Sequence, residues 1–295
     1  MTTRITQTMI SRNVLADLEL VSGRLDRTRA KLTSGKELTR PSDDPLLVGR
    51  ALQYRSELAA NRQYRRAIDE ATGWHEASDS SLSAISNMLR RARDLAVGGA
   101  NGASSPAARQ LMATEVDQLI EGIKTEANAQ YAGRYLFSGT TTLTAPYSTA
   151  DDAYHGNAST INREIGPGVQ LQVNTVGSAV VGDASSGIVK ALRDLSAHLR
   201  ANDLTAVASD LTAIDAVHDE LITARADIGS RVNRLDAAAE RLSELEESTV
   251  RLLSETEDAD MAKTLVDVST QQAVYESALR AGARIVQSSL LDFLR

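Results

Sequence analysis

The chain contains no cysteine and very few aromatic residues or prolines. Without cysteine, it can form neither a disulfide framework nor a metal site built from thiolates. Aromatic residues make up 3% of its 295 residues, whereas hydrophobic residues make up 42%. This composition favours long, narrow helix packing over a globule with deep pockets. We therefore expect a structural or interaction protein and not an enzyme.

The sequence also lacks a basic block, a membrane-spanning run and a secretory signal peptide. Its 32 basic and 39 acidic residues give a net charge of −7, without the basic cluster that nucleic-acid binding requires. No run of about 18 apolar residues occurs, and residues 1–10 carry no apolar stretch of the kind that a cleavable signal needs. We expect no nucleic-acid partner, no membrane insertion and, if the protein is exported, a route without a cleaved signal.

Motifs for catalysis, cofactors and metals are weak. Asp43 and Asp44 lie between two prolines, where they are better interpreted as turn and cap residues than as a catalytic pair. Gly35-Lys36 lacks the flanking residues of a phosphate-binding loop, and the acidic group at 255–260 lacks the turn glycine of a calcium loop. We interpret that acidic group as a solvated helix face. The histidines show no metal-ligand spacing: His75, His155, His198 and His218. We expect no catalytic residue, no cofactor and no metal.

Apolar residues at both ends of the chain recur with alternating spacings of four and three. This heptad pattern places them on one face of a helix. We expect the two terminal stripes to pair with each other, and the pair to require further copies of itself. The candidate assembly interface consists of Val14, Leu18, Val21, Leu25, Leu32, Leu265, Val268, Tyr275, Leu279, Val286, Leu290 and Phe293. Residues 1–12 are polar and lack a clear cap or apolar stripe, and we expect them to be poorly ordered on their own.

A proline-rich segment follows the first helix. Gly35 provides a stop signal, and Pro41 and Pro45 break any helix that would continue. The segment also offers an N-cap for the next helix, with Pro45 in its first turn. We interpret the following residues as a hinge: Pro41, Ser42, Asp43, Asp44 and Pro45.

Helical periodicity then continues, except in one internal stretch. Residues 46–97 and 106–131 follow a helical pattern, whereas Tyr135 with Phe137, and Val169 with Leu171 and Val173, alternate as in strands. The predicted fold is mainly α: a long antiparallel helical hairpin or coiled-coil rod with paired terminal helices and a small β-rich inserted domain at its tip. The predicted domains are a terminal coiled-coil assembly domain (1–40 and 258–295), a helical rod domain (41–132 and 187–257) and a β-rich insert (133–186).

Several segments resemble the flagellin superfamily, and within it the flagellar hook-associated protein 3 family. They are Leu32-Thr33-Ser34-Gly35-Lys36, Arg40-Pro41-Ser42-Asp43-Asp44-Pro45, Arg91-Ala92-Arg93-Asp94-Leu95-Ala96, Gly133-Arg134-Tyr135-Leu136-Phe137-Ser138-Gly139-Thr140 and Gln287-Ser288-Ser289-Leu290-Leu291-Asp292-Phe293-Leu294. The resemblance spans nearly the whole chain and is most specific around the proline hinge and the start of the insert. The acidic and hydroxyl-rich stretch 148–152 matches no segment of that family.

The resemblance implies an extracellular structural protein of the bacterial flagellum, exported by the flagellar type III apparatus. It implies a ring of copies between a second hook-associated protein on the hook side and flagellin on the filament side, and an export chaperone that binds the C-terminal helix. Two alternatives remain: a flagellin proper, or a cytoplasmic helical signalling protein that uses the same heptads to dimerise.

Overall fold

The computed structural model describes residues 7–293, and the side-chain surroundings of residue 9 and of 12–284. It divides into two compact units: a terminal unit, Met1–Ala59 with Leu245–Arg295, and a central unit, Ala60–Glu244. The boundary between them falls inside two long helices, and not at the predicted hinge. Each unit is described by itself.

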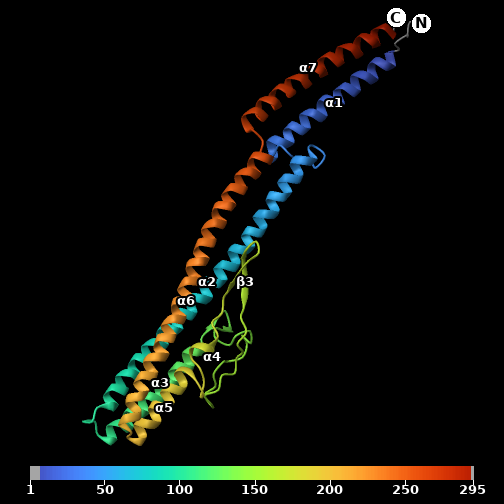
Figure 1. Ribbon diagram of the computed structural model, residues 1–295. Coiled ribbons are helices and arrows are strands. Elements are labelled where there is room, and N and C mark those ends of the chain that lie inside the picture. Colours follow the sequence, from blue (N-terminus) through green and yellow to red (C-terminus); the bar gives the residue numbers. More distant parts are fainter. Residues whose placement is uncertain (1–6, 294–295) are drawn as a thin grey trace. The chain divides into compact units, whose positions relative to one another are not determined.

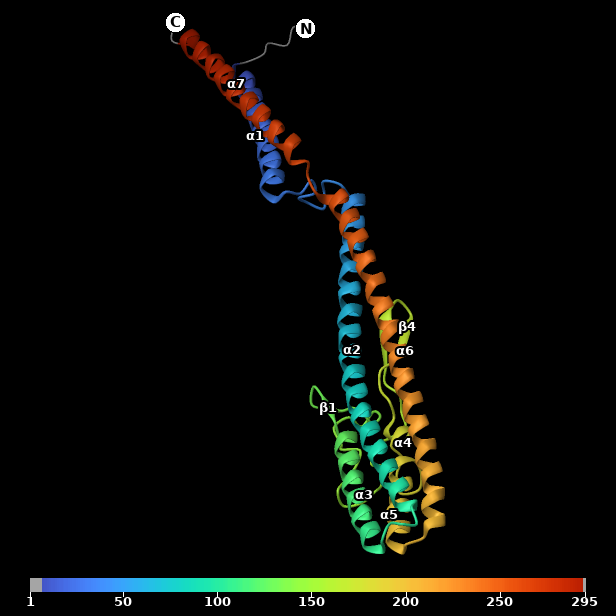
Figure 2. The same ribbon diagram turned by 90° about the vertical axis from the view of Figure 1, so that its left-hand side faces the viewer.

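The terminal unit contains both ends of the chain. The helices α1 (Gln7–Ser34) and α7 (Met261–Phe293) lie side by side in both views (Figures 1 and 2), together with the start of α2 (Pro45–Ala100) and the end of α6 (Leu204–Glu257). The predicted pairing of the terminal helices is therefore confirmed. The helix α1 begins at Gln7, within the polar segment 1–12.

In the central unit, α2 and α6 are antiparallel, because earlier residues of one contact later residues of the other. Arg225 of α6 donates to Asp79 of α2, with Nε to Oδ1 at 2.8 Å, and Arg93 of α2 donates to Asp215 of α6. Two shorter helices, α3 (Pro106–Ala127) and α5 (Gly187–Ala201), lie beside them (Figure 2). Fully buried residues from all four helices form the core, among them Leu82, Leu89, Ile120, Leu192 and Leu221.

Local signals in the sequence set the helix ends of this unit. The Ser105 side chain accepts a hydrogen bond from the Ala108 N–H at 3.2 Å, and Pro106 occupies the first turn of α3. Asn202 adopts a left-handed conformation with φ 59° and ends α5, and the Asp203 carboxylate then caps α6.

The inserted segment has little regular structure. It holds two short antiparallel pairs, β1 (Gln130–Tyr131) with β2 (Arg134–Tyr135) and β3 (Asn162–Gly166) with β4 (Val169–Gln172), and a short helix α4 (Gly177–Val180). Its loops enclose a buried tyrosine, Tyr147, whose hydroxyl donates to the Gly182 carbonyl at 2.7 Å. The prediction of a mainly α chain with a small β part is confirmed.

The insert does not lie at the tip of the helical hairpin. It contacts α2 near residues 64–74, as the Trp74–Tyr131 ring pair shows, and the Arg231 guanidinium of α6 donates to the Asn174 carbonyl. The tip is instead formed by the α2–α3 and α5–α6 turns, which Arg109 joins by bonding the Asn101 carbonyl and the Asn202 side chain. The predicted location is wrong because α3 and α5 fold back along α2 and α6, and carry the insert away from the tip.

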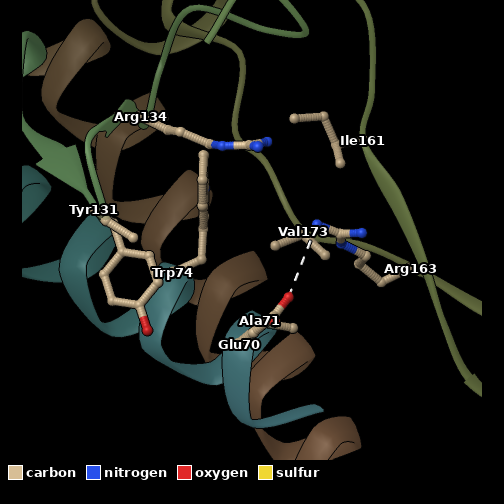
Figure 3. Close-up of a pocket in the computed structure, with 9 residues that line it drawn as sticks. Glu70, Ala71, Trp74, Tyr131, Arg134, Ile161, Arg163 and Val173 are labelled. Carbon is tan, nitrogen blue, oxygen red and sulfur yellow. Dashed lines mark ion pairs between the residues drawn. The ribbon is translucent and has the colours of Figure 1, made fainter. Parts of the chain in front are cut away.

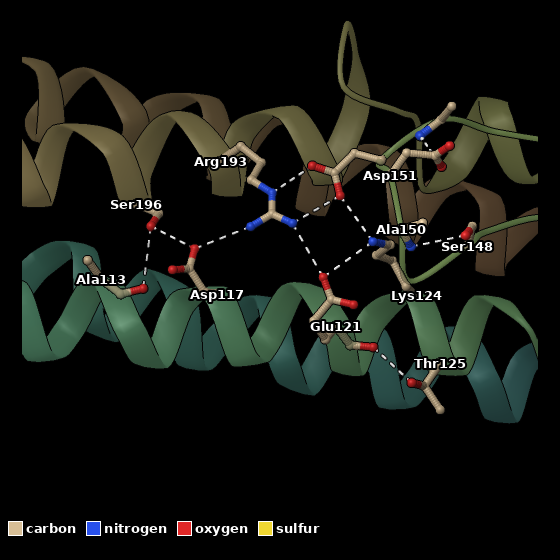
Figure 4. A network of polar contacts seen from close by, with 12 residues as sticks. Ala113, Asp117, Glu121, Lys124, Thr125, Ser148, Ala150, Asp151, Arg193 and Ser196 are labelled. Carbon is tan, nitrogen blue, oxygen red and sulfur yellow. Dashed lines mark hydrogen bonds and ion pairs between the residues drawn. The ribbon is translucent and has the colours of Figure 1, made fainter.

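An ionic network attaches the insert to α3 and α5 (Figure 4). The Arg193 Nε donates to Asp152 Oδ2 at 2.7 Å, and the buried Lys124 Nζ lies 3.1 Å from Asp152 Oδ1. Arg193 also pairs with Asp117 and Glu121. These hydrogen bonds, first of all that from Arg193, lower the pKa of Asp152. Residues 148–152, which matched no known segment, therefore include an anchor of the insert.

Candidate assembly site

The two terminal helices contact each other along one continuous face. On α1, the predicted residues Val14, Leu18, Val21 and Leu32 are half-buried and Leu25 is buried at 4% exposure. On α7, the face consists of Thr264, Val268, Gln271, Tyr275, Ala278 and Gly282. Its spacing of four and three is that of a heptad seam. The predicted stripe of α1 is the one that faces α7.

On α7, the contact face and the predicted stripe share every second residue. At the other positions, the residue that faces α1 comes one place earlier in the sequence than the predicted one. Val268 and Tyr275 belong to both, but Leu265 is 59% exposed and Leu279 is 43% exposed. The expectation that these two leucines pack on α1 is therefore wrong. The positions before them, Thr264 and Ala278, face α1 instead, because small residues allow two helix backbones to come close.

Gly282 shows how close the two helices come. A Cβ atom built on this residue would lie 3.0 Å from Cγ1 of Val14, which is tighter than ordinary packing contacts. About three helical turns before Gly282 on α7, Gln271 makes a polar contact with α1. Its side-chain oxygen accepts a hydrogen bond from the Thr28 hydroxyl at 3.3 Å. Val286, Leu290 and Phe293 have side chains outside the part of the chain whose surroundings are described.

Close packing over small residues leaves apolar side chains on the outside of the terminal unit. Besides Leu265 and Leu279, the exposed residues of α1 and α7 include Leu15 at 60%, Leu20 at 58% and Val266 at 62%. No other part of the described chain buries these side chains. Exposed apolar surface is common at protein-interaction sites when it forms a contiguous patch.

The hinge residues form a hydrogen-bonded turn between α1 and α2. α1 ends at Ser34, and Gly35 follows with φ +69°, a conformation that glycine adopts at little cost. The Asp43 carboxylate accepts from the Thr39 hydroxyl at 3.0 Å and from the Arg40 N–H at 2.8 Å, and these bonds lower its pKa. The Asp44 carboxylate accepts from the Leu46 and Leu47 N–H groups, both at 3.0 Å. It therefore caps α2, whose first residue is Pro45.

An ion-pair clamp joins this turn to the end of α6. Lys36 Nζ lies 2.5 Å from both Glu257 Oε1 and Asp258 Oδ1, and Arg55 Nη2 lies 2.5 Å from Glu257 Oε2. The backbone adds two bonds, from the Glu37 N–H to the Glu257 carbonyl and from the Ala259 N–H to the Gly35 carbonyl. Hydrogen bonds to Asp258 and Glu257 raise the pKa of Lys36, and the bond from Lys36 lowers the pKa of Asp258.

The clamp corrects the interpretation of residues 255–260 as a solvated helix face. Glu257 is only 5% exposed, Asp258 pairs with Lys36, and Asp260 caps α7 by accepting from the Lys263 N–H at 3.0 Å. The nested order of the helices brings Lys36 near Asp258, but the sequence alone does not give the register that pairs them. Lys36, Arg55 and Glu257 are the site residues that sequence reasoning missed.

Comparison with known proteins identifies the family. Residues 5–142 match the bacterial flagellin N-terminal helical region, and residues 211–294 match the bacterial flagellin C-terminal helical region. The two regions together cover more than half of the chain and include both terminal helices and the hinge.

The chain belongs to the flagellin family.

Within the flagellin family, the chain is similar to hook-associated and to filament proteins. It is 25% identical over 279 residues to flagellar hook-associated protein 3 of Escherichia coli (strain K12), covering 85% of this chain and 87% of that protein. It is also 25% identical over 270 residues to the flagellar filament 31.3 kDa core protein of Treponema maltophilum, covering 90% of each.

A solved structure agrees with the first of these relatives. A protein assigned as a flagellar hook-associated protein, from Vibrio parahaemolyticus, superposes with a TM-score of 0.67 at 26% identity, covering 73% of this chain and all of that one. The predicted resemblance to hook-associated protein 3 within the flagellin superfamily is thus confirmed. This flagellin-family chain is a structural component of the extracellular flagellum.

Among the described residues, no helix is long and apolar enough to cross a membrane. The same part of the chain contains no group of three or more His, Asp or Glu side chains placed to hold a metal ion.

Proposed function

We propose that this chain joins the flagellar hook to the filament as a ring of copies. The observation that carries the proposal is the terminal unit, in which α1 and α7 form a close pair and still expose Leu15, Leu20, Leu265 and Leu279. A pair of this kind needs neighbours, and copies of the same pair provide apolar faces of the same chemistry. The similarity to hook-associated protein 3 favours the junction over other positions in the flagellum.

The proposal includes the neighbours of the ring. On the hook side the partner is a second hook-associated protein, and on the filament side it is flagellin. Before assembly, the exposed apolar side chains of α7 need protection, and a flagellar export chaperone bound to this C-terminal helix would provide it. The protein leaves the cell through the flagellar export apparatus without loss of a signal peptide.

Immunogold labelling of isolated flagella tests the junction against the filament. A junction protein gives one narrow band where the hook meets the filament. Labelling along the whole filament would overturn the proposal and favour a flagellin, which the similarity to the Treponema filament protein makes the second candidate. A deletion strain adds an independent measurement, because cells without a junction protein should make hooks and release flagellin into the medium.

The third alternative, a cytoplasmic signalling protein, does not fit a chain of the flagellin family and is set aside.

A further inference from the structure

A pocket of about 520 Å³ lies where the insert meets α2, entirely within the central unit (Figure 3). Its wall combines apolar and aromatic side chains from both parts: Ala71 and Trp74 of α2 with Tyr131, Ile161 and Val173 of the insert. The rings of Trp74 and Tyr131 meet edge to face, with centroids 6.2 Å apart. The charged residues Glu70, Arg134 and Arg163 also belong to the lining, so the space is part apolar and part polar. A concave space of this size suits one or two side chains of a bound ligand.

Two guanidinium groups flank this space from opposite sides (Figure 3). The guanidinium of Arg134 makes no hydrogen bond or ion pair with the described residues, although the chain as a whole carries a net charge of −7. Arg163 has one weak partner, Glu70, at 3.9 Å, and both side chains of that pair are about half exposed or more, at 48% and 67%. The rim therefore carries two positive charges and the one negative charge of Glu70, and the guanidinium of Arg134 is available to an anionic partner.

The pocket wall also contains a polar group that the chain leaves without a partner. Trp74 is 8% exposed, and its indole nitrogen is buried without an acceptor among the described residues. A buried N–H group without an acceptor is costly, on the order of 1–3 kcal/mol. Because this nitrogen is buried and does not reach the open pocket, Trp74 contributes its ring to the wall and no hydrogen bond.

We propose that this pocket binds a peptide segment of a partner protein that carries an apolar side chain next to a carboxylate. The apolar side chain fills the space between Trp74 and Val173, and the carboxylate pairs with Arg134 and Arg163. Charge complementarity favours an acidic segment over a neutral or basic one, and the aromatic wall favours an aliphatic or aromatic neighbour. The site is separate from the terminal helices that the proposed function uses.

The chain offers a direct reporter for this site, since Trp74 is its single tryptophan. The full-length protein is titrated with the acetylated and amidated peptide Asp-Leu-Asp-Leu, and the emission of Trp74 is followed. A saturable change is expected. The matched peptide Asn-Leu-Asn-Leu, which keeps the shape and loses the charge, is expected to bind about tenfold more weakly.

Two variants locate the binding. Arg134→Gln is expected to weaken binding of the acidic peptide about tenfold, whereas Arg90→Gln, which changes an exposed arginine on α2 far from the pocket, is expected to leave it unchanged. Ile161→Phe keeps both arginines and fills the space, so it should also weaken binding. Circular dichroism melts of all three confirm folding, and a variant with a lowered melting temperature is replaced by Arg134→Lys, for which a smaller loss is expected.

The proposal is overturned if the acidic peptide causes no saturable change, or if the neutral peptide binds equally well. It is also overturned if Arg134→Gln and Arg90→Gln behave alike, because the carboxylate then binds elsewhere on the surface. A change of Trp74 emission with protein concentration alone would identify a second copy as the occupant instead.

Discussion

At the scale of single residues, burial of the titratable side chain of His75 affects the stability of the central unit. It is fully buried, and neither ring nitrogen has a hydrogen-bond partner among the described residues. Burial, with a smaller contribution from the Arg231 charge, lowers its pKa from 6.5 to about 4. The imidazole is therefore neutral in the folded protein at neutral pH, and its protonation opposes folding.

This burial predicts a pH-dependent stability. Because the folded pKa is depressed, the stabilisation by neutral His75 is fully present above pH 6.5 and is lost as pH falls towards 4, where the unfolded chain binds the extra proton. We expect a loss of about 2 kcal/mol in the free energy of unfolding between pH 7 and pH 5. His75→Leu should remove this loss, as measured by urea unfolding at both pH values.

The exposed His155 provides the control for this measurement, since its side chain is 43% exposed. His155→Gln should keep the pH dependence of the wild type. If His75→Leu loses as much stability on acidification as the wild type does, other groups cause the effect.

Glu257 is the residue on which the clamp at the hinge depends. It is buried and accepts from both Lys36 and Arg55, so Glu257→Gln removes two charge-assisted contacts at once. Its partners are partly exposed, which limits the loss to about 1 kcal/mol, or about fivefold in the open population of the joint. Limited trypsin digestion measures this opening at the Lys36–Glu37 bond, because Lys36 lies in the turn, whereas the Arg40–Pro41 bond resists trypsin. We expect cleavage there to become about fivefold faster.

A neighbouring glutamate serves as the control for the clamp. Glu255 lies two residues earlier on α6 and is exposed, so Glu255→Gln should leave cleavage at the turn unchanged. Equal cleavage rates for Glu257→Gln and Glu255→Gln would show that the ion pairs do not hold the joint closed.

At the scale of elements, the pair of helices α1 and α7 has two kinds of apolar residues, which the heptad pattern did not distinguish. Some hold the two helices together, and others remain exposed. Leu25 is buried at 4% exposure and faces α7, whereas Leu279 is 43% exposed and does not face α1. We expect Leu25→Asp to disrupt the pair itself, because burying a carboxylate costs on the order of 3 kcal/mol or more. We expect Leu279→Asp to preserve the pair and to block incorporation into the flagellum.

Two measurements distinguish these outcomes. Far-ultraviolet circular dichroism should show lost helix in Leu25→Asp and wild-type helix in Leu279→Asp, and labelling of hook tips should show incorporation of neither. An exposed polar position of the same helix gives the control, since Gln272→Asp should assemble normally. Normal incorporation of Leu279→Asp would mean that the outer face of α7 is not an assembly surface.

The elements themselves followed closely from sequence signals that act over a few residues. The first helix ends just before Gly35, where the sequence indicated a stop. Similar local signals begin α3 at Ser105 and Pro106 and end α5 at Asn202, because caps and stops depend on neighbouring residues. The face of α7 was harder to predict. A heptad pattern marks the apolar residues, but close packing selected Thr264, Ala278 and Gly282 for the contact with α1, and only the partner helix decides this.

The clamp and the position of the insert could not be predicted, for a related reason. Lys36 and Glu257 are more than 200 residues apart, and their contact depends on the register between α1, α2 and α6. The insert lies beside α2 because α3 and α5 fold back along the longer helices. This position depends on how the helices pack in three dimensions. Local sequence patterns contain neither register nor direction.

At the scale of the whole molecule, the turn from Pro41 to Pro45 connects the assembling terminal helices to the rest of the chain. Both prolines disfavour a continuous helix, and Asp44 starts α2 in a new direction by capping it. In the proposed junction, such a joint allows one chain to adapt to two adjoining structures. Pro41→Ala with Pro45→Ala is therefore expected to favour fusion of α1 with α2, to leave secretion intact and to weaken the hook–filament connection. Secretion and breakage of sheared flagella are measured in the same cells.

Pro106 provides the matched control, because it also occupies the first turn of a helix but lies in the central unit. Pro106→Ala removes the same ring from an equivalent position in α3, so it should change neither secretion nor breakage. Export is expected to survive in the double variant because the residues before α2 remain unchanged except at position 41. If sheared flagella of the double variant break no more often than those of Pro106→Ala, the prolines do not act as a joint. If secretion fails while the assembled junctions resist shear normally, the turn serves export and not the connection between hook and filament.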